Sequence, residues 1–447
     1  MELLRILRAL LRHRVFRRLL GVRVVTQLGD GFMQVAMLSY ALFSPQHQPD
    51  GWAIVAVLAI NYLPFSLIAP FVAPLLDHWS RQRCAIITDV IRTILCAAVT
   101  WQLLNSSDPA AEPIIVYILL LLVMSLNRFV LAGLAAGLAA TVDEDEYLHA
   151  CALMPMIGPS TLVIAGSIAG AIRIFFDDLL PLHASDAIIS GLAALTFAVS
   201  VILLTRIERD ELGPVRVPIT NTSPATPSTL KGVWSNIVDA LSYLKTRRVV
   251  VQGLIAVAIE RTGYGALMTL TILAYRNTFH QVADIGNAIA DMGTWFIASG
   301  VGFALSGVVA PVVAAKLKVR NSMLAMLALS AIVQLVPGSI LLRPALVAAA
   351  FANGVCVQCV KVYTDTLTQA HISDTYRGRI FMLYDIINNV ALVLGALAVA
   401  TVAPPAGLNL LAYLAVAFWL LLGALWFARA SAQCCVVFDK GSPWVRC

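Results

Sequence analysis

The chain has 447 residues, of which 60% are hydrophobic and only 13% are charged. Because soluble domains keep about a quarter of their residues charged, this composition excludes an ordinary soluble protein and indicates a membrane protein. The net charge of +6 comes from basic residues that gather between apolar segments. There they set the direction of membrane insertion, so they give no reason to expect nucleic-acid binding.

The first 18 residues, "MELLRILRALLRHRVFRR", alternate six arginines with leucine and isoleucine. This pattern predicts a cytoplasmic amphipathic segment over residues 1–18 that lies on an anionic membrane surface. An equally simple interpretation is that the arginines only fix the orientation of the first span.

Apolar segments long enough to cross a bilayer, about 20 residues at a rise of about 1.5 Å each, follow along almost the whole chain. They predict an all-α membrane protein with twelve transmembrane helices. The expected spans are 19–43, 53–76, 84–104, 114–140, 148–174, 186–205, 249–275, 285–315, 321–342, 345–370, 380–403 and 408–430.

A single long polar stretch, 206–248, divides the spans into two groups of six and is rich in Pro, Ser, Thr and charge. It predicts a cytoplasmic linker between an N-terminal six-helix bundle, 19–205, and a C-terminal six-helix bundle, 249–430. Residues 431–447 are expected to form a cytoplasmic tail. The Gly-x-Gly of "QLGDGF" in the first span aligns with that of "RTGYGA" in the seventh, which favours two pseudo-symmetric halves.

Lysine and arginine concentrate in alternate connections between the spans. The positive-inside rule therefore places both termini and the central linker in the cytoplasm. We expect a multi-pass protein of the inner (plasma) membrane.

The stretch "APLLDHWSRQR" after the second span resembles the signature loop of the major facilitator superfamily, with Asp77, Arg81 and Arg83 in its acidic and basic positions. "TDVIR" (88–92) and "DTYRGRIFMLYDIINNVALVLGALAVA" (374–400) resemble the bacterial drug and siderophore efflux branch. Ala73 and His78 depart from the consensus of the loop. In the fifth span, Gly158 and Pro159 are present without the glycine pair that follows in that branch.

In the resembling family, spans 1, 4, 7 and 10 line a central cavity. Each of these spans carries charge here, and the residues are Asp30, Arg128, Glu260, Arg261, Lys361 and Asp365. Asp30 and Arg128 lie at matching depths in their spans, which predicts an ion pair between them. The four charged residues of the C-terminal half are expected to form one cluster. Charges in a bilayer are costly, so they are either permanent ion pairs that hold the helices together or groups that change protonation during transport. Both readings stay open at this point.

A second set of residues is expected to gate the cavity at the cytoplasmic helix ends. By resemblance it comprises Asp77, Arg81, Arg83, Asp89, Arg92 and Asp385. Polar and aromatic residues at helix positions facing the expected cavity are candidates for substrate contact, although buried Asn and Gln in lipid often serve only to join helices. They are Gln27, Gln34, Asn61, Tyr264, Trp295, Asn388 and Asn389.

Together these features predict a secondary active transporter that exports a small amphipathic compound, such as a drug, siderophore or metabolite, by proton-coupled alternating access. The alternatives are an importer or lipid-linked-molecule flippase of the same fold, and a non-transporting receptor or assembly partner. No nucleotide-binding loop is found in the sequence, and no nucleophile–base set or metal-ligand spacing lies at a membrane face. The Cys-x-x-Cys at residues 356–359 has a metal-like spacing but lies inside an apolar segment without nearby His or further Cys, which favours packing. We therefore expect no enzyme, cofactor or metal. The expected partners are a small-molecule substrate, protons and membrane lipids, and the expected state is a monomer.

Overall fold

The computed structural model describes residues 10–42, 51–78, 80–105, 113–138, 141–143, 150, 154, 157–158, 160–161, 164–172, 175, 182–209, 211–212, 230–281, 285–340, 342–403 and 407–432. Expectations for the start of the amphipathic segment, most of the linker and the tail therefore lie outside the described residues, as does much of the expected fifth span. The side chains of Asp77 and Arg128 also lie outside them.

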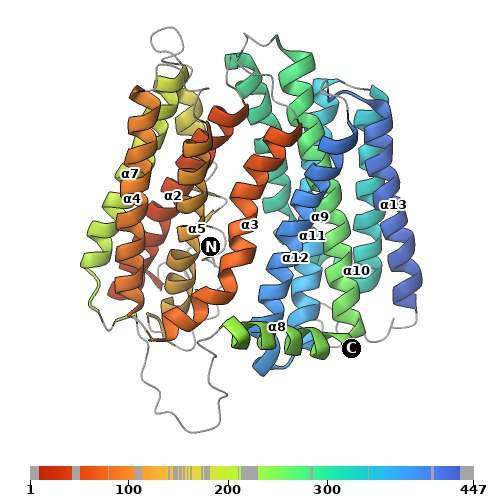
Figure 1. Ribbon diagram of the computed structural model, residues 1–447. Helices are drawn as coiled ribbons and strands as arrows, with labels where there is room; N and C mark the ends of the chain where they lie inside the picture. Colours follow the sequence, from red (N-terminus) through yellow and green to blue (C-terminus); the bar gives the residue numbers. More distant parts are fainter. Residues whose placement is uncertain are drawn as a thin grey trace. The chain divides into compact units, whose positions relative to one another are not determined.

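The described residues form twelve helical elements, which confirms the all-α fold class (Figure 1). The first group is α2 (Arg14–Leu42), α3 (Gly51–His78), α4 (Arg81–Asn105), α5 (Pro113–Gly137) and α7 (Leu182–Thr205). The second is α8 (Leu230–Lys245), α9 (Arg248–Ala274), the π-helical turn η2 (Tyr275–Phe279), α10 (Ile285–Ile340), α11 (Arg343–His371), α12 (Asp374–Val402) and α13 (Leu410–Ala432).

Within the described ranges, seven helices are long and apolar enough to cross a membrane. One of them, α10, covers both the eighth and ninth expected spans and is interrupted at Lys318, whose φ of 65° and ψ of 160° are not helical. The chain therefore turns at the basic connection that the sequence placed between these two spans. The structure shows a multi-pass membrane architecture.

The chain divides into two compact units, and the boundary at residues 233 and 234 falls inside the expected linker. Unit 1 comprises residues 1–46 and 67–233, and unit 2 comprises residues 47–66 and 234–447. The start of α3 is thus grouped with unit 2, whereas the sequence suggested that the whole second span belongs to the N-terminal bundle. At this start, Gly51 lies against the backbone of Ala400 in α12, an approach that leaves no room for a Cβ atom.

In unit 1, α7 packs against both α2 and α4, and α5 packs against α4. Apolar side chains at helical spacing on α2, among them Phe16, Leu19 and Val22, are fully buried in one cluster with Leu204 of α7. Close packing of such side chains stabilises the unit through van der Waals contact. This packing brings polar residues of α2, α4 and α7 to a common interior.

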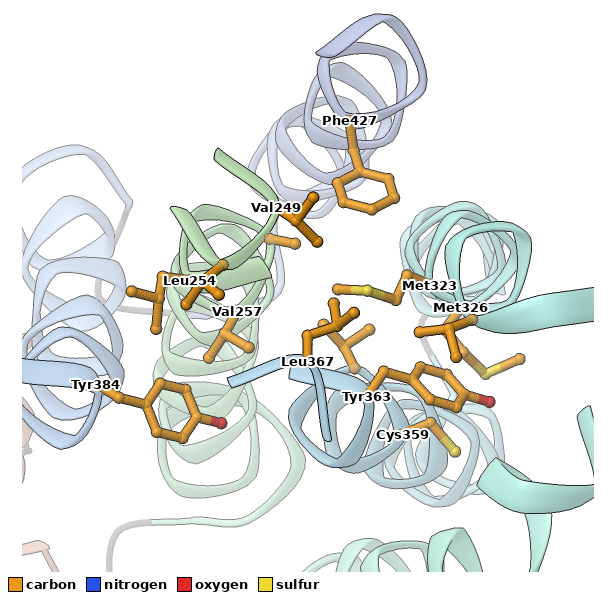
Figure 2. Close-up of a cluster of buried hydrophobic side chains, with 14 of the residues drawn as sticks. Val249, Leu254, Val257, Met323, Met326, Cys359, Tyr363, Leu367, Tyr384 and Phe427 are labelled. Atoms are coloured by element: carbon orange, nitrogen blue, oxygen red, sulfur yellow. The ribbon is translucent and has the colours of Figure 1, made fainter. Parts of the chain in front are cut away.

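In unit 2, α9 packs against α11, α12 and α13, while α10 packs against α11 and α13. Figure 2 shows the core that results, in which Val257 of α9, Met323 of α10 and Tyr363 of α11 belong to one buried cluster. The helix α8 lies across one end of this unit (Figure 1). The core therefore fixes how the charged side chains of α9 and α11 are directed.

Glycines allow α9 and α12 to approach closely. A Cβ atom on Gly265 would collide with the carbonyl oxygen of Leu392, and one on Gly395 would collide with that of Thr262. Small residues at helix interfaces are the usual means of close packing in membranes, where no hydrophobic force drives one helix onto another. The Gly-x-Gly that follows Glu260 and Arg261 thus holds their helix directly against α12.

Candidate functional site

A buried ionic cluster joins three helices of unit 1. Arg92 of α4 has a fully buried side chain that forms ion pairs with Asp30 of α2 and, at 2.9 Å, with Asp89 one turn away on α4. Its guanidinium also donates a hydrogen bond to the Thr26 hydroxyl at 3.0 Å and lies 3.7 Å from the centre of the Phe197 ring on α7. Residues of three helices thus contact the cation, and its Nε is buried without a hydrogen-bond partner among the described residues.

The two carboxylates of this cluster have further donors. Ser200 of α7 donates to Asp89 at 2.6 Å, and Gln27 of α2 donates to Asp30 at 2.8 Å. Hydrogen bonds to ionised groups are worth about 1.5–3 kcal/mol each, more than bonds between neutral groups. The arrangement gives each acid the same cation and at least one further donor, which suits a permanent link between α2, α4 and α7.

This cluster pairs Asp30 with Arg92, a partner that the sequence did not predict. We predicted Arg128 as the partner of Asp30, but in the structure Asp30 forms an ion pair with Arg92. The Arg128 side chain lies outside the described residues. The prediction considered only spans 1, 4, 7 and 10. Because α2 and α4 both pack on α7, the third span reaches Asp30 instead.

Within the described part of unit 1, the expected gating residues do not form one cluster. Asp89 and Arg92 are buried with Asp30, whereas Arg83 is exposed at the start of α4 and Asp385 is exposed on α12. Arg81 donates a hydrogen bond to the carbonyl oxygen of Leu212 at 3.1 Å. Asp77, whose side chain is outside the described residues, stays a prediction.

Glu260 on α9 is the central feature of unit 2. Its side chain is 1% exposed, and among the described residues neither carboxyl oxygen has a hydrogen-bond partner. Ser330 of α10 lies next to the carboxyl, but its hydroxyl donates to Asn353 Oδ1 of α11 at 2.8 Å. An ionised carboxylate without donors is very costly inside a protein, so this environment suits a neutral carboxylic acid.

The neighbouring residue, Arg261, points in another direction because adjacent helix positions differ by about 100°. Its guanidinium lies 6.0 Å from the centre of the Phe303 ring on α10. On α11, Lys361 and Asp365 form an ion pair at 2.9 Å, and the Lys361 ammonium lies 5.0 Å from the Tyr384 ring of α12. Both side chains of this pair are about a quarter exposed.

The expected four-residue cluster is therefore divided. Lys361 and Asp365 neutralise each other, and Glu260 pairs with neither Lys361 nor Arg261 within the described residues. Position along the span puts Glu260 and Lys361 at the same depth in the membrane, but it does not determine how α9 is rotated about its axis. That rotation turns Glu260 toward α10 and away from Lys361.

The expected substrate contacts are also spread over both units. Tyr264 is buried, its hydroxyl bonds that of Ser299 at 2.8 Å, and its ring stacks near Trp295. Asn388 donates to Asn389 at 3.3 Å. Two others, Gln34 of α2 and Asn61 of α3, are half-buried.

Ser330 and Asn353 were not among the site residues predicted from the sequence. A signal was available for Ser330, because Ser330 and Gln334 stand four residues apart in an otherwise apolar span and therefore share one helix face. Both are buried. Polar residues at this spacing in a span indicate an internal polar contact, although they do not say with which helix.

Comparison with known sequences finds two relatives that match most of the chain. Both are uncharacterized MFS-type transporters, one of Mycobacterium tuberculosis and one of Mycobacterium bovis. Each is 29% identical over 403 residues, which covers 88% of this chain and 86% of the relative. No family model matches the sequence.

Solved structures of transporters share the fold. The nucleoside transporter NupG superposes with a TM-score of 0.63 at 14% identity, covering 93% of this chain and 99% of NupG. A POT peptide transporter superposes with a TM-score of 0.66 at 14% identity, covering 95% of both chains. At such low identity these structures establish the fold alone.

The chain shares its fold with solved transporter structures. In sequence it is similar to MFS-type transporters, which are proteins named for the major facilitator superfamily. The comparisons assign no branch within that superfamily.

Proposed function

We propose that this transporter exports a small amphipathic compound, such as a drug, siderophore or metabolite, across the inner membrane in exchange for protons. Glu260 carries the proton. The observation behind this assignment is a fully buried carboxyl group whose two oxygens have no hydrogen-bond donor among the described residues. The resemblance of the chain to the drug and siderophore efflux branch supports the direction of transport and the class of compound.

The mechanism follows from how the environment of Glu260 acts on its charge. In the closed interior beside Ser330 and Asn353, the carboxyl is neutral because no donor stabilises an anion there. When the transporter opens and water reaches Glu260, hydration stabilises the carboxylate anion and the proton leaves. Binding and release of the proton on opposite sides of the membrane then couple the proton gradient to the conformational cycle.

The ionic cluster of unit 1 has a different role in this proposal. Asp30, Asp89 and Arg92 are mutually paired and hydrogen-bonded, so protonating either acid disrupts several strong contacts at once. They act as a structural link. Of the two carboxylates Asp30 and Glu260, only Glu260 is free of an ion pair within the described residues.

The test begins with finding the substrate. A deletion strain compared with the wild type for metabolite content and drug susceptibility yields candidate compounds, and the panel includes nucleosides, peptides and iron chelates because fold relatives carry such names. The purified protein in proteoliposomes is then given each candidate with and without a pH gradient. Proton flux on addition of the compound identifies the substrate.

With a substrate in hand, Glu260→Gln separates coupling from binding. Glutamine imitates the protonated carboxyl and cannot release a proton, so we expect at least a tenfold loss of pH-driven transport while substrate–substrate exchange without a gradient continues. Asp365→Asn is the matched control, since Asp365 is already paired with Lys361. Unchanged pH-driven transport by Glu260→Gln, measured in inverted vesicles, contradicts the assignment.

A further inference from the structure

The helices α10 and α11 of unit 2 touch at two glycines near the middle of their spans. A Cβ atom on Gly302 would collide with the carbonyl oxygen of Phe351, and one on Gly354 would collide with that of Ser299. Between this crossing and the ends of the helices near Asp291 and Arg343, a cavity of about 630 Å³ opens between them. Its volume lies in the range of about 300–1,000 Å³ that is typical of ligand sites.

This cavity is a trough with apolar walls. Its middle is lined by side chains that follow one face of each helix, Thr294, Ala298 and Val301 of α10 with Val347, Ala348 and Phe351 of α11. Val301 is 52% exposed and Phe351 is 36% exposed, so the trough opens on the outer surface of these two helices. In a bilayer that surface meets lipid chains and not water.

The end of the trough near Asp291 and Arg343 is polar. Asp291 and Arg343 form its end wall and are also part of a second cavity of about 420 Å³, lined by Phe279, His280, Gln281 and Asn287. Asp291 Oδ2 binds Arg343 at 2.8 Å and His280 Nε2 at 2.9 Å. A polar chamber and an apolar trough are thus joined through one ion pair.

Arg343 retains capacity to bind an anion. A guanidinium carries five N–H groups, and the bonds described use one toward Asp291 and one toward the carbonyl oxygen of Phe279 at 2.6 Å. The Arg343 side chain is 43% exposed. It also stands at the start of α11, where an apolar span begins and lipid headgroups lie.

We propose that this pair of cavities is a binding site for a phospholipid, with one acyl chain in the trough between α10 and α11 and the phosphate at Arg343. The order of polarity along the site matches that of a phospholipid, an anionic phosphate followed by an apolar chain. The arginine fork is suited to phosphate oxygens. Asp291 competes with the phosphate for the same guanidinium, so the ion pair tunes the affinity. The site is independent of the proposed transport reaction.

Because Asp291 and the phosphate compete for Arg343, substitutions of Arg343 and of Asp291 should change phospholipid affinity in opposite directions. The affinity of the purified protein for a phosphatidylcholine and for a diacylglycerol with the same chains is measured by native mass spectrometry. Arg343→Ala should weaken phosphatidylcholine binding about tenfold, the size expected for a lost charge-assisted hydrogen bond, and leave diacylglycerol binding unchanged. Asp291→Asn should strengthen phosphatidylcholine binding, because it frees the guanidinium.

The trough has its own matched pair of variants on α10. Val301→Trp fills the trough and should weaken binding of both lipids, whereas Val308→Trp, at a residue that is 63% exposed and lines neither cavity, should weaken neither. Lipid binding unaffected by Val301→Trp overturns the proposal. So does an Arg343→Ala effect that is equal for the two lipids.

Two further measurements complete the design. Should Arg343→Ala fail to fold, Arg343→Lys keeps the charge but loses the fork, and it should give a smaller loss that is again confined to the phospholipid. Inorganic phosphate alone should compete only weakly with the phospholipid. Competition by phosphate at the affinity of the lipid itself would indicate an anion site without a lipid and would overturn the proposal.

Discussion

Two charged side chains inside the spans meet opposite environments. Arg92 has two carboxylates, a hydroxyl and an aromatic ring around it, whereas Glu260 has no donor for either oxygen among the described residues. A buried charge with full partners stabilises a structure only as long as every partner remains. A buried acid without partners is stable only in its neutral form. The first arrangement therefore suits a fixed link and the second a proton carrier.

Removal of Arg92 should be severely destabilising. Arg92→Met preserves much of the side-chain volume but leaves Asp30 and Asp89 buried next to each other without their cation. Breaking such a pair costs about 3–5 kcal/mol, so thermal unfolding in detergent should shift down by several degrees.

Arg83→Met on the same helix is the control for this change. Arg83 is exposed, and surface substitutions usually stay within about 0.5 kcal/mol. Equal unfolding temperatures for the two variants would show that Arg92 does not hold α2, α4 and α7 together.

At the scale of elements, α8 shows how a helix outside the spans is attached. It buries Ala240 and Leu244 in the core of unit 2, stacks Tyr243 on Tyr376 at a ring separation of 4.1 Å, and pairs Asp239 with Arg379 at 2.8 Å. The hydrogen bond with the Ser373 side chain lowers the pKa of the Tyr243 phenol. Apart from the buried apolar residues, all of these contacts join α8 to residues at the beginning of α12.

The relative weight of these contacts can be measured. The Asp239–Arg379 pair is exposed, with 48% and 27% of the two side chains accessible, and such pairs contribute about 0–1 kcal/mol. Leu244 is 6% exposed, and removing a buried leucine costs about 2–5 kcal/mol. Leu244→Ala should therefore speed amide hydrogen exchange of α8 far more than Arg379→Ala does.

An equal effect of both variants, or a larger effect of Arg379→Ala, would mean that charge and not burial attaches α8. High salt offers an independent check, because it screens the exposed ion pair and leaves the apolar contact intact.

At the scale of the whole molecule, each unit has a core of its own, and the long polar connection separates them. The ends of the unit 2 spans differ in charge. Basic residues Lys245, Arg247 and Arg248 lie where α8 meets α9, while Arg343 is paired with Asp291 at the opposite end. By the positive-inside rule we expect the α8 end to face the cytoplasm.

This orientation predicts a labelling pattern. In a background from which the eight cysteines have been replaced, a single cysteine at the exposed position Gln281→Cys should react with a membrane-impermeant maleimide added to intact cells. Thr246→Cys, also at an exposed position, should react only after permeabilisation. The reverse pattern would place both termini outside and would also oppose export as the direction of transport.

The amino-acid sequence by itself determined the membrane class, the all-helical fold, the division near the polar linker and the positions of the charges along the spans. These depend on hydropathy and on charge spacing, which are properties of local segments. Only the tertiary structure decided that Arg92 meets Asp30, that Ser330 and Asn353 lie beside Glu260, and that α3 begins in unit 2. Partners across helices depend on how each helix is rotated and which helix lies next to it, and packing over the whole unit sets both.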